Sequence, residues 1–407
     1  MTGSASLRRC VVLKHGEIFL KGRNRHRFED LLHHNLRLAL RGVPGGAWVR
    51  PGRGVSVIGG QAGTDELVAR ATRVMGLAAV MPAAAVPNAL PDITAAAVTV
   101  LRDELAERGG TTFAVRARRR NKSFPVTSSE LAAHLGAEIR AELPLTVQLT
   151  DPDLELHVEV SGRETYLSCR QLPGQGGLPV GASGRALVLL SGGYDSPVAA
   201  YRAMRRGLHC DFVHFSGAPL TGPASTYKAY ALVRELNRYQ PAGRLATVAL
   251  GGAQKKLALA GAGRYQVIAQ RRLMLRTAEA LAAREGRQAL VTGDSLGQVA
   301  SQTLTNLATL DESVSLPILR PLLGFEKREI IAEAERIGTA EISVLSDEDC
   351  CQLLLPEYTA TRAEPRHLTT IEARLGVDAT VDGLVSAARW LTPDPERGTD
   401  TPTADPA

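Results

Sequence analysis

The sequence predicts an α/β protein whose largest part is a doubly wound parallel sheet, preceded by a smaller α+β region. From residue 186 onward, short apolar runs alternate with amphipathic helical stretches, which favours parallel strands with helices on both faces. The segment before residue 172 mixes strands and helices without that strict alternation. Between the two parts, glycines are concentrated in residues 172–184, where we expect a linker.

Length and composition limit the class of protein. A chain of 407 residues predicts two or three domains, and 44% hydrophobic with 22% charged residues is ordinary globular composition. The apolar stretches are well short of the roughly 18 residues that cross a bilayer, so we expect no membrane segment. The first residues contain no long apolar run of the signal-peptide kind, which predicts a cytoplasmic protein.

Basic residues are concentrated in the N-terminal part. Residues 1–171 hold 23 Lys and Arg against 17 Asp and Glu, whereas the remainder holds 25 of each kind. This asymmetry indicates an anionic partner that binds the N-terminal part, with nucleic acid as the first candidate. A solvated basic surface is the alternative.

The N-terminal part shows strand and helix patterns in turn. An apolar run in residues 11–20 predicts a strand that leads into a turn, and residues 28–40 place Phe28, Leu32 and Leu36 on one helix face. After a break at residues 42–46, the remaining predictions are helices at 65–75, 93–107 and 129–143 and strands at 113–118, 154–160 and 164–168.

The C-terminal part is predicted as alternating strands and helices. The predicted strands are residues 186–190, 211–215, 246–250 and 288–292. The predicted helices are residues 198–206, 226–238, 265–284, 298–309 and 327–337. The tail from Thr392 is rich in Pro, Asp and Thr without apolar periodicity, so we expect it to be disordered.

The sharpest functional signal is the sequence LLSGGYDS at residues 189–196, which ends an apolar strand and precedes a helix. Gly192 and Gly193 allow a tight turn, and Ser191 and Ser196 supply hydroxyls. A helix N-terminus directs free N–H groups at a bound anion, so this segment predicts a phosphate-binding loop. It matches neither the Walker A pattern nor GxGxxG.

The pattern SGGxDS resembles the PP-loop of ATP pyrophosphatases, which split ATP between its α and β phosphates. Three further segments resemble the tRNA 4-thiouridine synthetase (tRNA sulfurtransferase) family: KHGEIFLKGRN at residues 14–24, FAVRARRRNKSFP at 113–125 and TGDSLGQVASQ at 292–302. The resemblance covers about residues 10–375. It is to the short form of the family, because no cysteine follows Cys351 and too few residues remain for a rhodanese domain.

The resemblance implies domains and a reaction. It implies a ferredoxin-like domain at residues 1–64, a THUMP RNA-binding domain at 65–171, the linker at 172–184, a PP-loop ATP pyrophosphatase domain at 185–391 and the tail at 392–407. The implied reaction uses ATP and Mg²⁺ to adenylate O4 of the uridine at the eighth position of tRNA, and sulfur then replaces that oxygen to give 4-thiouridine.

The family's nucleotide-site residues can be matched one by one. Asp195 is implied to orient Mg²⁺ and the pyrophosphate, because a carboxylate beside phosphates needs an intervening cation. The implied nucleotide contacts are Leu189, Leu190, Ser191, Gly192, Gly193, Asp195, Ser196, His214, Phe215, Arg271, Gly293 and Gln302. For His214 the alternative is a satisfied strand-end histidine, and for Gln302 it is an amide on a helix surface.

Two basic clusters fit the phosphates of tRNA. The first places five cations within seven residues and contains no acid: Arg116, Arg118, Arg119, Arg120 and Lys122. The second includes Lys14, Lys21 and Arg23. We expect both clusters to bind tRNA; a solvated strand end and a charged loop are the alternatives.

Sulfur transfer needs a nucleophile that attacks C4 of the adenylated uridine, and a cysteine thiolate or persulfide is the natural carrier. The chain has five cysteines without CxxC spacing, so we expect no disulfide framework and assign no metal-ligating residues. The resemblance favours Cys350 as catalytic, with Cys351 beside it as the alternative. The acids of residues 347–349 should raise the thiol pKa unless tRNA or a lysine offsets their charge.

The resemblance alone implies further partners: a cysteine desulfurase as persulfide donor, a carrier protein of thiamine thiazole synthesis, and a second copy in a homodimer. Three other readings stay open. A PP-loop amidotransferase or synthetase would share SGGxDS without needing the basic N-terminal part, and a non-catalytic tRNA-binding protein would not need an intact loop. A THUMP methyltransferase would need a glycine-rich cofactor loop after a strand, which we do not find.

Overall fold

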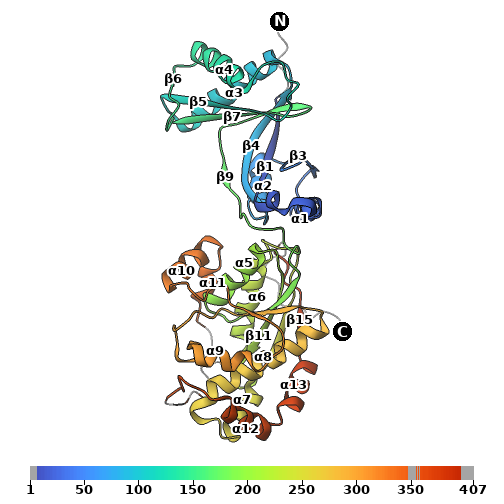
Figure 1. Ribbon diagram of the computed structural model, residues 1–407, viewed down its shortest axis with the longest axis vertical. Coiled ribbons are helices and arrows are strands. Elements are labelled where there is room, and N and C mark those ends of the chain that lie inside the picture. The colour runs from blue at the N-terminus through green and yellow to red at the C-terminus, as the bar shows by residue number, and fades with distance from the viewer. Residues whose placement is uncertain (1–6, 347–353, 355, 357, 396–407) are drawn as a thin grey trace. The chain divides into compact units, whose positions relative to one another are not determined.

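Figure 1 shows a computed structural model of the chain, which describes residues 7–346, 354, 356 and 358–395. The chain divides into two compact units, residues 1–178 and residues 179–407, which we call the N-terminal and C-terminal units. The division lies inside the glycine-rich stretch of residues 172–184. None of the helices in the described residues is long and apolar enough to cross a bilayer.

One mixed sheet runs through the described part of the N-terminal unit. Its order is β2-β3-β1-β4-β8-β7-β5-β6, and β9 pairs with β4. Its strands are β1 (Arg8–His15), β2 (Ala47–Arg50), β3 (Val55–Gly60), β4 (Leu77–Pro87), β5 (Thr112–Arg119), β6 (Thr146–Val147), β7 (Leu154–Val160), β8 (Glu164–Ser168) and β9 (Leu172–Pro173). Strand β5 runs parallel to β6 and β7, and the other pairs are antiparallel.

Helices of the N-terminal unit pack on one face of this sheet, in two cores. The helices are α1 (Arg25–Ala39), α2 (Thr64–Ala71), α3 (Leu90–Arg108) and α4 (Ser128–Glu142), with the 3₁₀ helix η1 (Glu17–Asn24) before α1. Leu32 of α1 shares the first core with Val80 of β4. Leu135 of α4 shares the second core with Val86 of the same strand. Val80 and Val86 point to the same side of β4, so both helix pairs cover one face, and Figure 1 shows α3 and α4 together above β5 and β7.

Helix α2 belongs to the first of these cores. Leu67 and Ala71 of α2 are buried with Leu32, and Val74 and Leu77 extend the same cluster. We expected the first domain to end at residue 64, but its core continues through α2 into β4.

The sequence does not predict strand β4, although this strand lies at the centre of the sheet. Its residues are rich in alanine and include Pro82, both of which are unfavourable in a central strand. The strand forms because β1 pairs along its whole length on one side, while β8 and β9 pair with it on the other. Tertiary pairing therefore outweighs local propensity here.

The C-terminal unit contains the predicted doubly wound sheet, in the order β14-β13-β10-β11-β12-β15. Its strands are β10 (Arg185–Leu189), β11 (His209–Ser216), β12 (Leu245–Ala249), β13 (Ala289–Val291), β14 (Ile318–Leu319) and β15 (Arg389–Leu391). Neighbouring strands are parallel up to β12, and β15 adds an antiparallel edge that we did not predict. The predicted α/β class is confirmed.

Helices cover both faces of this sheet. They are α5 (Asp195–Arg205), α6 (Ala224–Leu236), α7 (Gly251–Leu259), α8 (Gln266–Arg284), α9 (Leu304–Asp311), α10 (Lys327–Arg336), α11 (Ala340–Ser343), α12 (Pro365–Leu375) and α13 (Val377–Ser386), with 3₁₀ helices η2 (Gly263–Tyr265) and η3 (Ala300–Gln302). Leu187 of β10 is buried in one core with Leu273 of α8. Its neighbours Ala186 and Val188 are fully buried and point to the other face, where α5 packs against β10.

The helix that we predicted at residues 298–309 is shorter in the structure. Residues 300–302 form η3, and α9 begins only at Leu304. Thr303 is the N-cap of α9 and accepts a hydrogen bond from the Asn306 N–H through its hydroxyl (3.3 Å). A threonine cap fixes a helix start, so the preceding residues are free to form a loop.

Only the first residues of the predicted tail belong to the described part of the chain. The Pro393 carbonyl accepts a hydrogen bond from the Asn237 side chain (2.8 Å). Residues 396–407, on which most of the disorder prediction falls, lie outside the described residues.

Two buried histidines meet at one hydroxyl in the first core. Nε2 of His15 lies 2.9 Å from Oγ of Ser56, and Nε2 of His33 lies 2.8 Å from the same oxygen. Burial lowers the pKa of His15 to about 4, against the opposing charge of Glu29, and burial also lowers the pKa of His33. Both rings are therefore neutral at pH 7 in the folded chain.

We predict that the N-terminal unit loses stability as pH falls from 6.5 toward 4. In this range the unfolded chain binds protons on His15 and His33 that the folded chain does not, so the free energy of unfolding falls with pH. The measurement is thermal unfolding as a function of pH for the wild type and His15→Gln, whose slope should be smaller. The control is His34→Gln, which replaces an exposed histidine next to His33 on α1. An unchanged slope in His15→Gln contradicts the prediction.

Candidate active site

The order of the C-terminal sheet reverses at β10. This strand lies between β11, which the chain reaches through α5, and β13, which it reaches after α8. Open α/β sheets bind ligands beyond the carboxyl ends of the strands at such a switch point. The predicted phosphate-binding segment, residues 189–196, begins at the last residue of β10, and its loop residues 190–194 lead into α5 at this point.

Two serines close the phosphate loop. Ser196 Oγ accepts a hydrogen bond from the Ser191 N–H (2.9 Å) and lies 3.1 Å from Ser191 Oγ. The Gly193 N–H points at Ser191 Oγ from 3.4 Å. Tyr194, the N-cap of α5, makes no side-chain capping bond, so the first turn keeps free N–H groups for an anion.

A second loop packs against the first turn of α5. A Cβ on Gly293 would lie 2.7 Å from the backbone nitrogen of Ser196 and 2.9 Å from the carbonyl carbon of Asp195. Both contacts are to backbone, which cannot move away cheaply. Glycine at this position therefore allows the loop after β13 to lie directly against the phosphate loop.

Asp195 is held by two side chains from other segments. Its Oδ1 lies 2.6 Å from Nζ of Lys327, the first residue of α10, and its Oδ2 accepts a hydrogen bond from Nε2 of Gln298 (3.2 Å). The side chains of Asp195 and Lys327 are 22% and 44% exposed, so this ion pair is open to a ligand. A charged carboxylate and a flexible ammonium thus lie together beside the phosphate loop.

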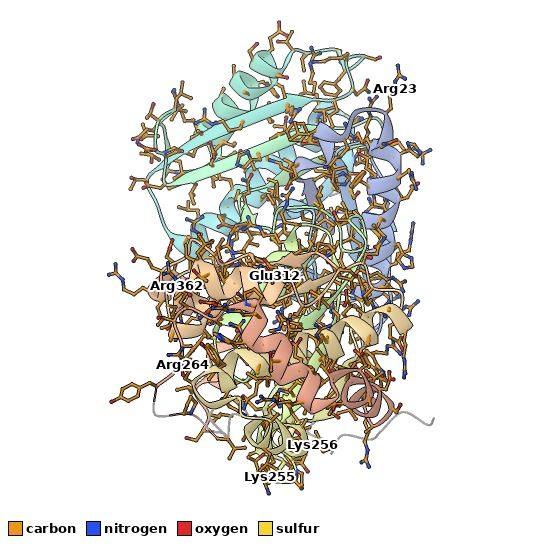
Figure 2. The ribbon with its side chains drawn as sticks, turned by 60° about the horizontal axis from the view of Figure 1, so that its bottom comes forward. Arg23, Lys255, Lys256, Arg264, Glu312 and Arg362 are labelled. Carbon is orange, nitrogen blue, oxygen red and sulfur yellow. The ribbon has the colours of Figure 1, made fainter. Side chains whose placement is uncertain are left out.

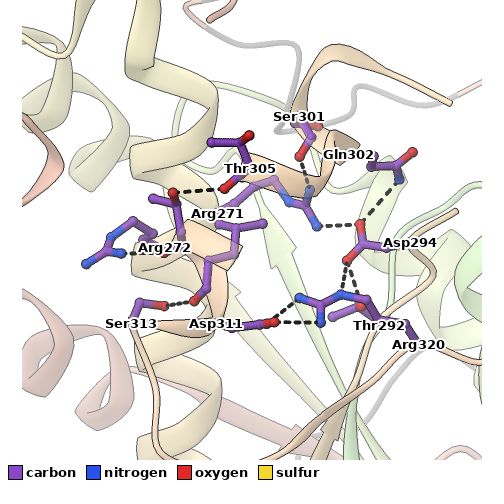
Figure 3. Close-up of polar contacts among 12 residues, drawn as sticks. Arg271, Arg272, Thr292, Asp294, Ser301, Gln302, Thr305, Asp311, Ser313 and Arg320 are labelled. Atoms are coloured by element: carbon purple, nitrogen blue, oxygen red, sulfur yellow. Dashed lines mark hydrogen bonds and ion pairs between the residues drawn. The ribbon is translucent and has the colours of Figure 1, made fainter. Parts of the chain in front are cut away.

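A buried carboxylate, Asp294, organises the other side of the site (Figure 3). Its Oδ1 accepts hydrogen bonds from Nη2 of Arg271 (2.5 Å) and Nε2 of Gln302 (3.3 Å). Its Oδ2 accepts from Oγ1 of Thr292 (2.8 Å) and Nε of Arg320 (3.4 Å). One side chain therefore ties α8, η3 and the segments after β13 and β14 together.

Asp294 stays charged in this setting. Burial alone would raise the pKa of its carboxyl, but Arg271, Thr292 and Arg320 outweigh burial and hold the pKa below its ordinary value. Arg320 also forms a two-bond ion pair with Asp311 (2.6 and 3.2 Å). Arg271 donates to the Ser301 carbonyl as well (3.3 Å), so its guanidinium is fixed from two directions.

His214 has ring contacts typical of a structural histidine. Its Nδ1 lies 3.0 Å from the Leu190 carbonyl and its Nε2 lies 3.2 Å from Oγ of Ser225. The ring is buried and joins the start of the phosphate loop to α6. The side chains of Phe215 and Leu189 lie in and against the core beneath α8. A nucleotide contact at these residues and at Leu190 stays a prediction.

The structure brings several of the predicted residues together and adds others. Ser191, Asp195, Ser196 and Gly293 are adjacent, while Asp294 links Arg271 to Gln302. Sequence reasoning missed Asp294, Lys327, Gln298 and Arg320. Asp294 and Gln298 lie within the quoted segment TGDSLGQVASQ, whereas Lys327 and Arg320 have no local signal because their partners are remote in sequence.

Both cysteines predicted to carry sulfur, Cys350 and Cys351, lie outside the described residues. Burial raises the pKa of Cys10 and of Cys169 to about 12, and it raises the pKa of the fully buried Cys210 further. These three thiols are therefore protonated near neutral pH and are poor nucleophiles.

The first predicted tRNA-binding cluster lies on and beyond β5. Arg116 pairs with Glu155, and Arg120 pairs with Glu159, so β7 offsets two of its charges. Arg119 donates to the Phe124 carbonyl, whereas Arg118 and Lys122 are exposed.

The second cluster is spread over β1 and η1. Lys14 donates to Oε1 of Gln171 (3.2 Å), Lys21 lies over the Phe28 ring, and Arg23 is exposed. Lys14, Arg116 and Arg118 also line one hollow of about 200 Å³ on the sheet face opposite the helices, which brings part of both clusters together.

Three family profiles match the chain. The profile described as "Thiamine biosynthesis protein (ThiI)" matches residues 181–377, the THUMP domain matches residues 87–170, and the ThiI ferredoxin-like domain matches residues 10–80.

The chain is similar along nearly its whole length to curated proteins named probable tRNA sulfurtransferase. It is 57% identical to the one from Nocardia farcinica over 97% of each chain, and 40% identical to the one from Moorella thermoacetica over 95% of this chain and 98% of that protein. Among solved structures, a 4-thiouridine synthetase in complex with RNA and bound ATP superposes with a TM-score of 0.87. It is 30% identical, and the match covers 95% of this chain and all of that one.

We predict that Gly293→Ala destabilises the C-terminal unit by roughly 1–3 kcal/mol, the usual effect of forcing an atom into a packed contact. Thermal or urea unfolding measures this change. Gly324→Ala is the matched control, because a Cβ on Gly324 meets no atom within 4 Å. Equal stability of the two variants would show that the loop after β13 does not need glycine.

Proposed function

This chain belongs to the tRNA sulfurtransferase family, and we propose that it transfers sulfur to tRNA in an ATP-dependent reaction that makes 4-thiouridine from the uridine at the eighth position. The observation that carries the proposal is the SGGYDS loop at the carboxyl end of β10, with Asp195 and Lys327 paired beside it. The similarity of the chain to a 4-thiouridine synthetase solved with bound ATP supports ATP as the nucleotide.

The reaction that we propose has two steps. The uridine O4 attacks the α-phosphorus of ATP, the bond to the bridging oxygen breaks, and pyrophosphate leaves. A sulfur nucleophile then adds to C4 of the adenylated uridine, and AMP leaves with the former O4 oxygen. Where that nucleophile is the outer sulfur of a cysteine persulfide, a second thiol attacks the cysteine sulfur, which breaks the S–S bond, forms a disulfide and leaves the outer sulfur on C4. Adenylation is needed because an unactivated oxygen at C4 is a poor leaving group.

Different residues of the site have different roles in these steps. The loop N–H groups, the Ser191 and Ser196 hydroxyls and the first turn of α5 bind the leaving pyrophosphate, whose charge the helix N-terminus favours. Lys327 and Arg271 supply positive charge, and the latter is held in place by Asp294. A fixed cation stabilises the charge that grows on the leaving group without reorganising during the step.

Asp195 is the residue that fits Mg²⁺. Within the described residues, no three or more acids, histidines or cysteines are grouped so that they could hold a metal ion. Mg²⁺ usually binds through one or two carboxylates and the phosphates of its substrate, so a single part-exposed carboxylate next to a phosphate loop fits this ion. When bound, Mg²⁺ would neutralise phosphate charge. In the structure Lys327 donates to this carboxylate, so Mg²⁺ and Lys327 would have to share Asp195.

We propose Cys350 as the sulfur-bearing residue. Ser343 donates to the carbonyl of Gly193 in the phosphate loop (3.3 Å), and Cys350 follows seven positions later in the sequence. A cysteine desulfurase is the proposed persulfide donor, and the same cysteine could serve a thiamine carrier protein, which the description of the matching profile favours as a second route.

We predict that Asp195→Ala lowers the rate of ATP-dependent tRNA thiolation by about 100-fold or more, a typical loss for a group that acts on transition-state charge. Its affinity for tRNA should stay within about twofold of wild type, because the predicted RNA-binding residues lie elsewhere. The measurement combines labelled-sulfur incorporation with filter binding of tRNA.

Asp382→Ala, which removes an exposed carboxylate from α13 of the same unit, is the control for that experiment and should thiolate normally. Loss of tRNA binding by folded Asp195→Ala protein would refute a role of Asp195 in chemistry.

We predict that Cys350→Ser abolishes sulfur incorporation from cysteine and a desulfurase, while Cys351→Ser and Cys169→Ser retain it. Only a reactive thiol can carry a persulfide, and Cys169 is protonated near neutral pH. Labelled sulfur is counted in tRNA and on the protein. Normal incorporation by Cys350→Ser would assign the sulfur to another residue.

A further inference from the structure

Four exposed cations lie on or next to α7 and α12 in the C-terminal unit. Lys255 and Lys256 lie on α7, Arg264 lies in η2 just after it, and Arg362 precedes α12; Figure 2 labels all four on the surface. Helices α7 and α12 pack against each other, and Arg374 of α12 donates to the Ala260 carbonyl at the end of α7 (3.4 Å). We call Lys255, Lys256, Arg264 and Arg362 the α7 patch.

The charges of the α7 patch are not offset by acids in the described part of the chain. None of the four patch residues forms an ion pair with an acid among the residues that the structure describes. Arg264 instead donates to the Tyr265 hydroxyl (2.8 Å) and lies over the Tyr265 ring, which stacks on His367. The predicted N-terminal cluster differs, because Arg116 and Arg120 are paired. Unpaired exposed cations raise the local potential and attract a polyanion.

The α7 patch is joined to the active-site residues by one segment of chain. The Ala360 N–H donates to the Arg264 carbonyl (2.9 Å), and Asn306 at the start of α9 donates to the Ala360 carbonyl (3.0 Å). Thr303 donates to the Thr361 carbonyl (2.7 Å), next to Arg362.

Gln302, which bonds to Asp294, directly precedes Thr303. Residues 302–306 and 360–361 therefore connect the patch to the nucleotide site.

We propose that the α7 patch binds the phosphate backbone of tRNA close to the uridine that reacts. This proposal rests on the proposed function, because it takes tRNA as the substrate of the adjoining site. A duplex or a strand that presents one nucleotide to the site must place its neighbouring phosphates nearby, and each phosphate bound by Lys or Arg releases counterions. Phosphate contacts of this kind set the register of the RNA without reading its sequence.

The test is tRNA affinity as a function of salt for the full chain with Lys255→Gln, Lys256→Gln, Arg264→Gln and Arg362→Gln combined. We expect binding at physiological ionic strength to weaken by about tenfold or more, and the slope of log K against log salt to shrink by up to about 3.6, since each lost phosphate contact removes about 0.7–0.9. ATP binding should be unchanged, which also shows that the variant is folded.

The matched control removes four exposed arginines elsewhere in the same unit: Arg185→Gln, Arg238→Gln, Arg284→Gln and Arg389→Gln. Arg284 ends α8, a helix of 19 residues that begins two residues after Arg264 and is about 28 Å long at 1.5 Å per residue. The control should keep a near wild-type affinity. An equal loss of tRNA affinity in both variants would show that only the net charge of the protein matters, and it would overturn the proposal.

Other outcomes separate this proposal from the proposed function. If wild-type protein thiolates tRNA and the patch variant binds tRNA normally, the patch is not an RNA contact. If that variant has lost thiolation only with a desulfurase, and inorganic sulfide restores it, the patch binds the protein donor and the proposal is wrong. If the wild-type protein neither binds nor thiolates tRNA, the proposed function itself fails.

Discussion

The charged carboxylate of Asp294, buried between Arg271 and Arg320, is the interaction on which the arrangement of the active site depends. Removing one member of a buried ion pair leaves the others uncompensated, which commonly costs about 3–5 kcal/mol. Gly293, the preceding residue, lies against the first turn of α5, so the position of Asp294 is fixed relative to the phosphate loop. Arg271 and Arg320 therefore keep a set position before any nucleotide binds, which is the condition for electrostatic stabilisation of a transition state.

The two units handle their charges differently, and this difference bears on how tRNA is bound. The N-terminal unit holds the net excess of basic residues, but β7 supplies acids that pair with Arg116 and Arg120. The C-terminal unit has equal numbers of basic and acidic residues, and ion pairs such as Arg320 with Asp311 use some of those acids. Net charge by region therefore points to the N-terminal unit and gives no sign of the α7 patch.

Local features of the fold could be predicted from sequence, and features that depend on distant partners could not. The SGGYDS loop could be predicted because its strand, glycine turn and helix start are consecutive in the sequence. The contact between Lys327 and Asp195 could not, because 132 positions separate the two residues. Strand β4 has an unfavourable composition and forms through its neighbours β1 and β8. The helix predicted at 298–309 was too long because apolar periodicity does not reveal the cap at Thr303. Asp294 was visible within TGDS, but only its contact with Arg271 on α8 shows what it does.

We infer above all that the phosphate loop cleaves ATP between its α and β phosphates in step with sulfur transfer to tRNA. The direct measurement follows AMP, pyrophosphate and labelled sulfur in tRNA together, in one reaction of the wild-type chain with ATP, Mg²⁺, cysteine and a desulfurase. We predict one AMP and one pyrophosphate for each 4-thiouridine at the eighth position, and no AMP beyond background when tRNA is left out. Formation of ADP and phosphate, or sulfur incorporation without ATP, would contradict the account.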